Sequence, residues 1–477
     1  MRTEAISPPV RIGALPDEIL LDIFDLYCRN AEAPNWRFRA PIVGLNLEQW
    51  REQWNRLVHV CQRWRSLVFA SPVRLDLCLH CTDKTPARET LNVWPPLPIE
   101  ILVLQPHNVD NIIAILEHCD RVRNIGIFDL TIPQLERLAP VMQEPFPALT
   151  SLRLELEAGK TLAPALPNMF LGGSAPRLQG LYLSGIPFPG LPSLLLSATD
   201  LSYLSLFGIP HTGYISPEAM VTCLSALTRL TRLFIEFQSP ASRPDRRSRR
   251  PPPLTRVILP ALEAFDFRGV SEYLEDLVAR IDAPQLRTLD ISLFNQVIFD
   301  IQQLTYFIGH VGILESSDSA EVVFADDHVQ ILFYLSNGTG PLKNLRLGIN
   351  CRAVDWQVLS MVQICNQFSF LLSIVENLTL RTGYPSPGST WQVDMEHTQW
   401  LELFRSFTAV RTLKISDELQ SLIVLALQEL TGERVVEVLP ALVSLNPEYQ
   451  SGSKQQAIEP FVAARRHSNH PVTVTYD

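Results

Sequence analysis

The chain contains 477 residues, of which 46% are hydrophobic and 19% are charged, and its formal net charge at pH 7 is -10. This composition is typical of a globular protein, and an elongated repeat array can hold a chain of this length more easily than one compact core. The negative charge argues against nucleic acid as a partner, because backbone phosphates require a basic surface.

The sequence also indicates whether to expect a membrane span, a secretory signal or disulfide bonds. No apolar run approaches the roughly 18 residues of a membrane-spanning helix, so we expect no membrane partner. Residues 1–14 lack the apolar core of a secretory signal and are expected to be a disordered tail. The eight cysteines are scattered, so we expect reduced thiols in an intracellular protein, cytoplasmic or nuclear.

Two amphipathic helices are predicted within residues 15–71. The first begins at Pro16, with acidic residues in its first turn, and its apolar stripe contains Ile19, Leu20, Ile23, Phe24 and Tyr27. The second is predicted from Asn46 to Ser71, with apolar residues at alternating steps of three and four: Leu47, Trp50, Trp54, Leu57, Cys61, Trp64 and Val68. Such helices could cap a repeat array or bind a partner.

Two motifs in these helices carry a resemblance. The segments Leu15-Pro16-Asp17-Glu18-Ile19-Leu20 and Val60-Cys61-Gln62-Arg63-Trp64-Arg65-Ser66-Leu67 resemble the two halves of an F-box. Residues 28–53 form an insertion between the halves, as in the divergent F-box-like proteins of mushroom-forming fungi. The resemblance implies docking onto a Skp-type adaptor, and through it onto a cullin, by these residues: Leu15, Pro16, Ile19, Leu20, Ile23, Phe24, Leu57, Val60, Cys61, Trp64 and Leu67.

Residues 72–446 contain a recurring Leu-x-x-Leu-x-Leu pattern. Its central leucines, such as Leu152, Leu181, Leu204 and Leu233, recur at intervals of roughly 23 to 29 residues, which match a leucine-rich repeat. Helix signals lie between the copies, so the predicted fold class is α/β: an irregular leucine-rich-repeat solenoid with parallel strands on its concave face. The asparagine that many such repeats carry after the strand is absent, hence the expected irregularity.

Several elements of the array are predicted individually. Residues 321–324 are expected to form a strand of their own repeat, and a helix is expected from Asp326 to about Gly338. Residues 447–477 are expected to cap the open end with a helix over 458–466 and a strand over 472–474. The Arg- and Pro-rich segment 239–253 is expected to be a disordered loop, with a nuclear-import or acidic-partner patch as the alternative.

No catalytic motif is present, so we expect neither an enzyme nor a cofactor. Cys78, His80 and Cys81 have zinc-like spacing, but a tetrahedral site needs more ligands and no suitable pair follows. The expectation is therefore no metal, and a reduced, partly buried strand edge at these residues.

The outward-pointing strand residues form the candidate client surface, because exposed aromatic residues favour binding hot spots. The predicted client-binding residues are Arg153, Tyr182, Phe207, Phe234, Asp266, Arg268, Asp290, Arg346 and Arg381. The alternative is an ordinary solvated surface. The resulting hypothesis is a substrate-recognition subunit of a Skp-cullin-F-box ubiquitin ligase, with an unknown client protein. Its alternative is a leucine-rich-repeat scaffold without a ligase link.

Overall fold

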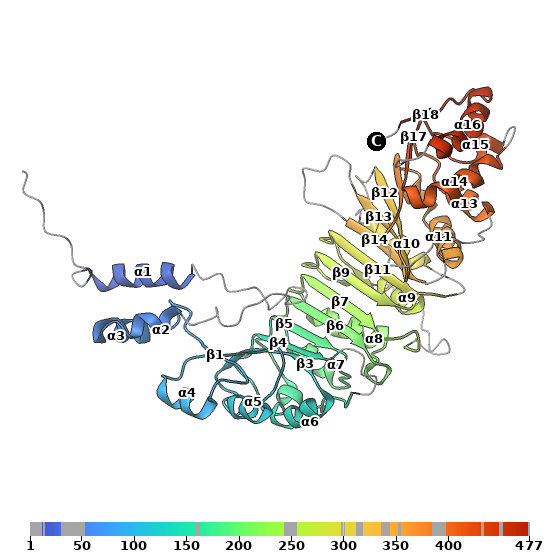
Figure 1. Cartoon of the computed structure of the whole chain (residues 1–477). Helices are drawn as coiled ribbons and strands as arrows, with labels where there is room; N and C mark the ends of the chain where they lie inside the picture. The colour runs from blue at the N-terminus through green and yellow to red at the C-terminus, as the bar shows by residue number, and fades with distance from the viewer. Residues whose placement is uncertain are drawn as a thin grey trace, which may run out of the picture. The chain divides into compact units, whose positions relative to one another are not determined.

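A computed structural model of the chain describes residues 12, 15–29, 53–157, 163–242, 255–296, 299, 301–311, 318–334, 344–351, 354–383, 397–430, 434–447 and 452–475 (Figure 1). The chain divides into two compact units, Met1–Tyr203 and Leu204–Asp477. Most of the predicted tail, of the insertion 28–53 and of the loop 239–253 lies outside the described residues. Within the described part, no helix is both long and apolar enough to cross a membrane.

The first unit begins with three helices, α1 (Asp17–Arg29), α2 (Gln53–Val58) and α3 (Gln62–Ala70). The prediction of α1 is confirmed, whereas the single long second helix is wrong over its described part, because it is broken at residues 59–61. Cys61 has an extended backbone, with φ -160°, and precedes α3. Arg65 Nε donates to the carbonyl oxygen of Val58 at 2.9 Å, so a side chain satisfies the end of α2 in place of a continuing helix.

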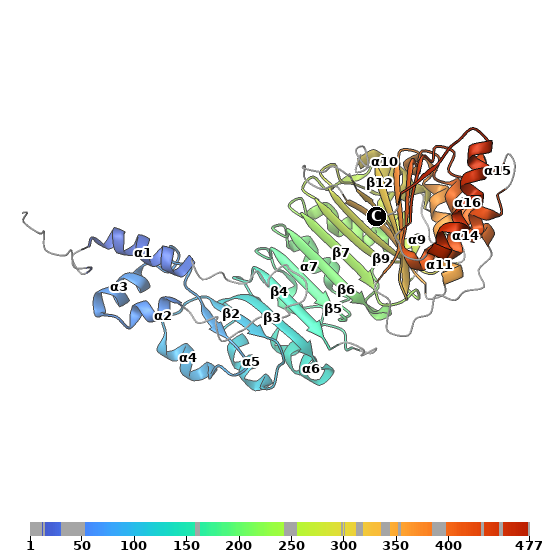
Figure 2. The ribbon, with the colours of Figure 1, turned by 45° about the horizontal axis from the view of Figure 1, so that its top comes forward.

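A parallel sheet follows the helices in this unit. Each strand pairs in parallel with the next, in the order β1 (Leu79–Cys81), β2 (Ile99–Val103), β3 (Val122–Leu130), β4 (Ser151–Leu156) and β5 (Gly180–Ser184). The connections contain α4 (Ala87–Val93), α5 (Val109–Leu116), α6 (Ile132–Val141) and a 3-10 turn, η3 (Phe170–Gly173). Figure 2 shows α4, α5 and α6 on one side of these strands. The predicted alternation of strand and helix is confirmed here, and the repeating leucines form its buried core.

The helix α7 (Leu191–Ser197) and the strand β6 (Tyr203–Ile209) lead to the second unit. Its sheet has the order β7 (Arg232–Phe237), β9 (Ala264–Gly269), β11 (Thr288–Phe294), β14 (Asn344–Asn350), β13 (His328–Tyr334), β12 (Ser319–Phe324), β15 (Asn377–Thr382), β16 (Thr412–Ile415), β17 (Ser444–Pro447) and β18 (Thr473–Val474). Two further strands, β8 (Val257–Ile258) and β10 (Ile281–Asp282), pair separately.

Along the chain, most helices of the second unit occur in the connections between its strands. They are a 3-10 turn, η4 (His211–Gly213), and α8 (Pro217–Ala226), α9 (Ser271–Val278), α10 (Gln302–Val311), α11 (Val354–Gln367), α12 (Ser369–Leu372), α13 (His397–Arg405), α14 (Asp417–Gln428), α15 (Arg434–Glu437) and α16 (Gly452–His467). The predicted C-terminal helix and strand are confirmed as α16 and β18. Arg465 of α16 is fully buried and donates to the carbonyl oxygens of Val435, Leu439 and Leu442.

The uniformly parallel sheet and the helix predicted from Asp326 are both wrong. Residues 328–334 form β13, which is antiparallel to both β12 and β14. Burial alternates along β13 residue by residue, which is the period of a strand with one buried face. A tight turn joins β12 to β13, and in it Ala325 N donates to His328 O at 2.8 Å. The predicted strand at 321–324 exists as β12. It does not pair with β11 as the strand of the next repeat would, because β14 takes that place in the sheet.

Aromatic side chains fill the core of the second unit beside β9. The rings of Phe237 and Tyr273 have centroids 4.7 Å apart, and those of Phe267 and Tyr273 stack at 5.9 Å. Gly269 lies against this cluster, where an added Cβ would be 2.8 Å from Phe267 and 2.9 Å from Phe237. The close approach of these rings therefore requires glycine at the end of β9.

Candidate functional site

The helix α1 has two apolar stripes with different surroundings. Leu20 and Phe24 are buried, and the Phe24 ring lies 4.7 Å from that of Trp64 on α3. Ile19, Ile23 and Leu26 remain 45%, 40% and 63% exposed. Their spacing of four and three residues places them on one face. The structure thus presents a continuous apolar face on α1.

The predicted adaptor-binding residues are divided by this arrangement. Leu20 and Phe24 of α1 and Leu57 of α2 are buried, so they hold these helices together and cannot contact a partner. Val60, 58% exposed, and Cys61 are exposed at the break between α2 and α3. Pro16, which directly precedes α1, is also exposed. Leu15, Trp64 and Leu67 are half-buried. Leu26 is the residue that the prediction missed, although it lies seven residues after Ile19 and therefore on the same helical face.

An arginine joins the two half-motifs. The guanidinium of Arg63 on α3 donates to the carboxylate of Asp17 at 2.5 Å and to the carbonyl oxygen of Leu15 at 2.6 Å. A second ion pair, at 2.5 Å, joins Arg74 and Asp22. These pairs are exposed, so each contributes at most about 1 kcal/mol, and packing of Phe24 against Trp64 is the stronger link.

A polar depression lies on the strand face of the second unit. Its volume is about 380 Å³, and its lining residues come from β7, β9, β11, β13, β14 and the turn before β13: Phe234, Glu236, Asp266, Phe267, Arg268, Asp290, Ser292, Asp327, His328, Gln330, Arg346 and Asn350. Strand register places Phe234, Asp266, Asp290 and Arg346 in one row. Five of the predicted client-binding residues thus meet here, namely Phe234, Asp266, Arg268, Asp290 and Arg346.

Most charges in the depression are already paired. Arg346 contacts Asp290 at 2.9 Å and Arg268 contacts Glu236 at 3.4 Å. Asp266 forms no ion pair with any residue that the structure describes. Burial, and then the neighbouring Asp290, raise the pKa of Asp266 to about 6. The depression therefore contains one carboxylate that a cation would stabilise.

Aromatic rings border the depression. Phe207 and Phe234 stack with their centroids 5.7 Å apart and their planes at 20°, and Phe207 is 38% exposed. A flat apolar pair beside an acidic group is a surface on which a guanidinium or an ammonium group can bind. Phe207 and Phe234 were both among the predicted client-binding residues, and the structure brings them together.

Arg153, Tyr182 and Arg381 do not belong to this depression. Arg153 is only 4% exposed, and its guanidinium lies over the rings of Phe128 at 4.7 Å and Tyr182 at 4.2 Å. The prediction that Arg153 is an exposed contact residue is therefore wrong, because aromatic residues on the two neighbouring strands enclose it. Arg381 is exposed and forms an ion pair with Glu321.

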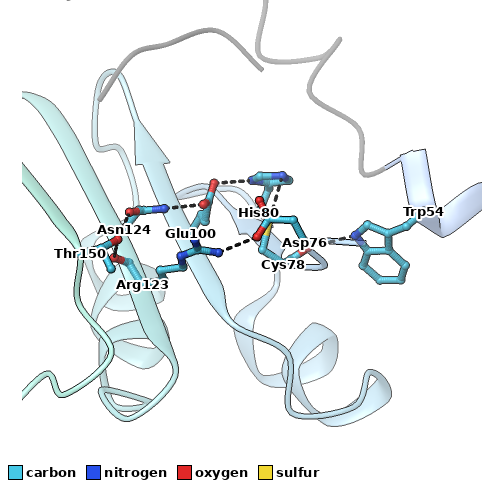
Figure 3. A network of polar contacts seen from close by, with 8 residues as sticks. All are labelled: Trp54, Asp76, Cys78, His80, Glu100, Arg123, Asn124 and Thr150. Carbon is cyan, nitrogen blue, oxygen red and sulfur yellow. Dashed lines mark hydrogen bonds and ion pairs between the residues drawn. The ribbon is translucent and has the colours of Figure 1, made fainter. Parts of the chain in front are cut away.

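A second polar cluster lies across β1, β2 and β3 and the residues directly before β1 and β4 in the first unit, and Figure 3 shows its side chains in a continuous row. Cys78 Sγ lies 3.4 Å from His80 Nε2, and His80 Nδ1 lies 3.4 Å from Glu100 Oε2. Asn124 donates to the other carboxylate oxygen of Glu100, and Thr150 Oγ1 donates to Asn124 Oδ1 at 2.9 Å.

This cluster is mostly buried, and both burial and the contacts within it shift the pKa values of its members. Burial alone would lower the pKa of His80, but the hydrogen bonds with Cys78 and Glu100 outweigh it and raise that pKa to about 10. Burial raises the pKa of Cys78, against the lowering effect of His80. Glu100 is the member that motif reading missed, because it lies on the next strand and its position opposite His80 follows from register.

No protein-family model matches the chain, and no curated protein matches it. Among solved structures, the leucine-rich repeat-containing protein LegL7 from Legionella pneumophila is similar, with 13% sequence identity and a TM-score of 0.25. The match covers 81% of this chain and 97% of that chain.

Proposed function

We propose that the chain is a non-catalytic interaction protein, the substrate-recognition subunit of a Skp-cullin-F-box ubiquitin ligase. Residues 15–71 would bind a Skp-type adaptor, residues 72–446 would bind a client protein, and residues 447–477 would cap the array. The two F-box-like motifs support the first assignment. The observation that carries it is the exposed apolar face of Ile19, Ile23 and Leu26 on α1, which nothing else in the described chain covers.

Adaptor binding would bury this face together with Val60 and Cys61. Three large apolar side chains on one helical face are the usual anchors of a helix-binding partner, and each such hot spot contributes about 2 kcal/mol or more. Buried Leu20 and Phe24 hold α1 in place, so the exposed face is presented by a helix that is already ordered.

The test mixes the purified full chain with a purified Skp-type adaptor and measures the dissociation constant by calorimetry. Ile19→Asp combined with Ile23→Asp should reduce the affinity at least a hundredfold. Val93→Asp is the matched control, since Val93 is 73% exposed on α4 and lies outside α1 to α3. Absence of a complex between the unmodified chain and the adaptor at micromolar concentrations would refute the ligase assignment.

The alternative is a scaffold in which α1 to α3 only cap the array. It is favoured by one contact: Trp54 Nε1 donates to the carbonyl oxygen of Cys78 at 3.1 Å and so links α2 to the segment leading into β1. The same experiment separates the two functions. A pure cap predicts no adaptor complex, and a loss of thermal stability when residues 1–71 are removed.

The client surface is proposed to be the strand-face depression with the Phe207 and Phe234 pair, and its ligand a segment presenting arginine or lysine. Asp266 supplies a carboxylate that pairs with no cation among the described residues, and the rings supply a stacking surface. The arginines of the depression are already neutralised, so an acidic ligand would have to break an existing pair.

Two peptide pools test this client chemistry, one with a fixed central arginine and one with its neutral isostere citrulline. The chain should bind the arginine pool more tightly, and Asp266→Asn should abolish that preference. Asp110→Asn is the control, because Asp110 is an exposed carboxylate on α5 in the other unit. Equal binding of both pools would refute a cationic client, while leaving adaptor binding untouched.

A further inference from the structure

We propose that Cys78, His80 and Glu100 form a binding site for a zinc ion. One donor atom from each of these residues lies within 4.8 Å of the other two. The strands β1 and β2 bring them together, since His80 is the register partner of Glu100 and Cys78 precedes His80 by two residues on the same face. The site shares no residue with either surface of the proposed function and does not depend on it.

The donor atoms and their spacing suit zinc. A thiolate sulfur, an imidazole nitrogen and a carboxylate oxygen are the three protein ligand types of zinc, whereas calcium and magnesium take oxygen alone. With Zn–S of about 2.3 Å and Zn–N of about 2.0 Å, tetrahedral ligands lie roughly 3.5 Å apart. The observed distance from Cys78 Sγ to His80 Nε2 is 3.4 Å. Glu100 approaches the ring from Nδ1, and the set of one donor atom per residue lies within 4.8 Å, so the ligands would close in around the ion. Water would take the fourth position.

Outer contacts already orient these donors. Asn124 donates to one oxygen of Glu100, and Thr150 in turn donates to Asn124, so the carboxylate is held in place (Figure 3). The bond from Trp54 Nε1 to the carbonyl oxygen of Cys78 holds the backbone at the sulfur ligand. Outer-shell hydrogen bonds of this kind typically change metal affinity by about 10- to 100-fold.

Charge and access are also compatible with a divalent ion. Zinc binding would release the protons of the Cys78 thiol and the His80 ring to solvent, and the resulting thiolate and the Glu100 carboxylate would balance the two charges of zinc. The nearby cation, Arg123, is engaged by Asp76 at 2.7 Å. Glu100 is only 4% exposed, but the His80 side chain is 27% exposed, so an ion can enter from the side of the imidazole. Bound zinc would fasten β1 to β2 next to α2.

The test uses the full chain in three single variants and the unmodified form. Zinc affinity is measured by competition with a chromogenic chelator, and cobalt(II) is the spectroscopic probe for a thiolate ligand. Cys78→Ser removes the sulfur, and Glu100→Gln preserves the shape of the side chain. Cys81→Ser is the matched control, because Cys81 is a buried cysteine of β1 whose side chain points to the face opposite that of His80.

The unmodified chain and Cys81→Ser should each bind one zinc ion per chain at this site, with a thiolate-to-cobalt charge-transfer band. Cys78→Ser should lose that band, and Glu100→Gln should weaken zinc binding at least tenfold. Circular dichroism of each variant verifies folding, and Glu100→Gln serves alone if Cys78→Ser does not fold. Zinc binding that survives both substitutions, or no zinc binding by the unmodified chain, would overturn the proposal.

Discussion

Replacing Arg153 tests whether an arginine on the strand face is structural. Its guanidinium lies between the rings of Phe128 and Tyr182, at 4.7 and 4.2 Å from their centroids, and the side chain also contacts Glu155 at 3.3 Å. Arg153→Ala removes both ring contacts and most of the buried stem. An exposed arginine would lose almost nothing on the same change.

The magnitude follows from the parts that are lost. Each cation–π contact contributes about 1 kcal/mol, because Arg153 is largely removed from water. Two buried methylene groups contribute about 0.8 kcal/mol each. Alanine avoids the entropy cost of ordering the arginine side chain on folding, which offsets roughly 1.5 kcal/mol of the loss. Arg153→Ala should therefore destabilise the first unit by about 2 kcal/mol. Arg153→Met, which preserves an apolar stem, should recover roughly half.

Urea unfolding followed by fluorescence measures this loss. Because the chain has two compact units, the unfolding transition of each unit must be resolved separately. Arg137→Ala is the matched control in the same unit, since Arg137 is half-exposed and forms an ion pair with exposed Asp110. It should change stability by less than about 0.5 kcal/mol. If Arg153→Ala were as mild as this control, the enclosed guanidinium would contribute nothing and the reasoning would fail.

Three further changes have defined outcomes. Trp64→Ala should cost about 3 kcal/mol, because the half-buried indole packs on buried Phe24, and an unchanged denaturation midpoint would contradict this packing. The pKa of Asp266 is raised to about 6, above its unfolded value of about 3.9, so its contribution to stability should fall as pH rises from about 4 to 6. Asp266→Asn should remove that dependence and, allowing for partial exposure, stabilise the second unit by about 1 kcal/mol at pH 7; identical urea midpoints at pH 5 and 7.5 in the parent would argue against it. Gly269→Ala should lower the thermal midpoint by the equivalent of about 1–3 kcal/mol, since its Cβ would overlap the Phe267 ring, and an unchanged midpoint would show that the rings can move aside.

The sequence alone determined the elements whose signals are local. Pro16 and the acidic residues after it marked the start of α1, and the repeating leucines marked the buried strands with their core-facing side. Such signals depend on residues within one turn of helix or one strand, so they survive in any tertiary context. Even so, the local signal at Asp326 was misread, because a turn and an alternating strand follow it rather than a helix.

Only the tertiary structure decided which side chains meet across strands. Sequence alternation placed Arg153 on the outward face, but its burial comes from Phe128 and Tyr182 on strands far away in the chain. In the same way, Glu100 joins Cys78 and His80 through the pairing of β1 with β2. The connections between strands vary in length, so the register that sets these neighbours results from packing of the whole repeat and has no local signal in the sequence.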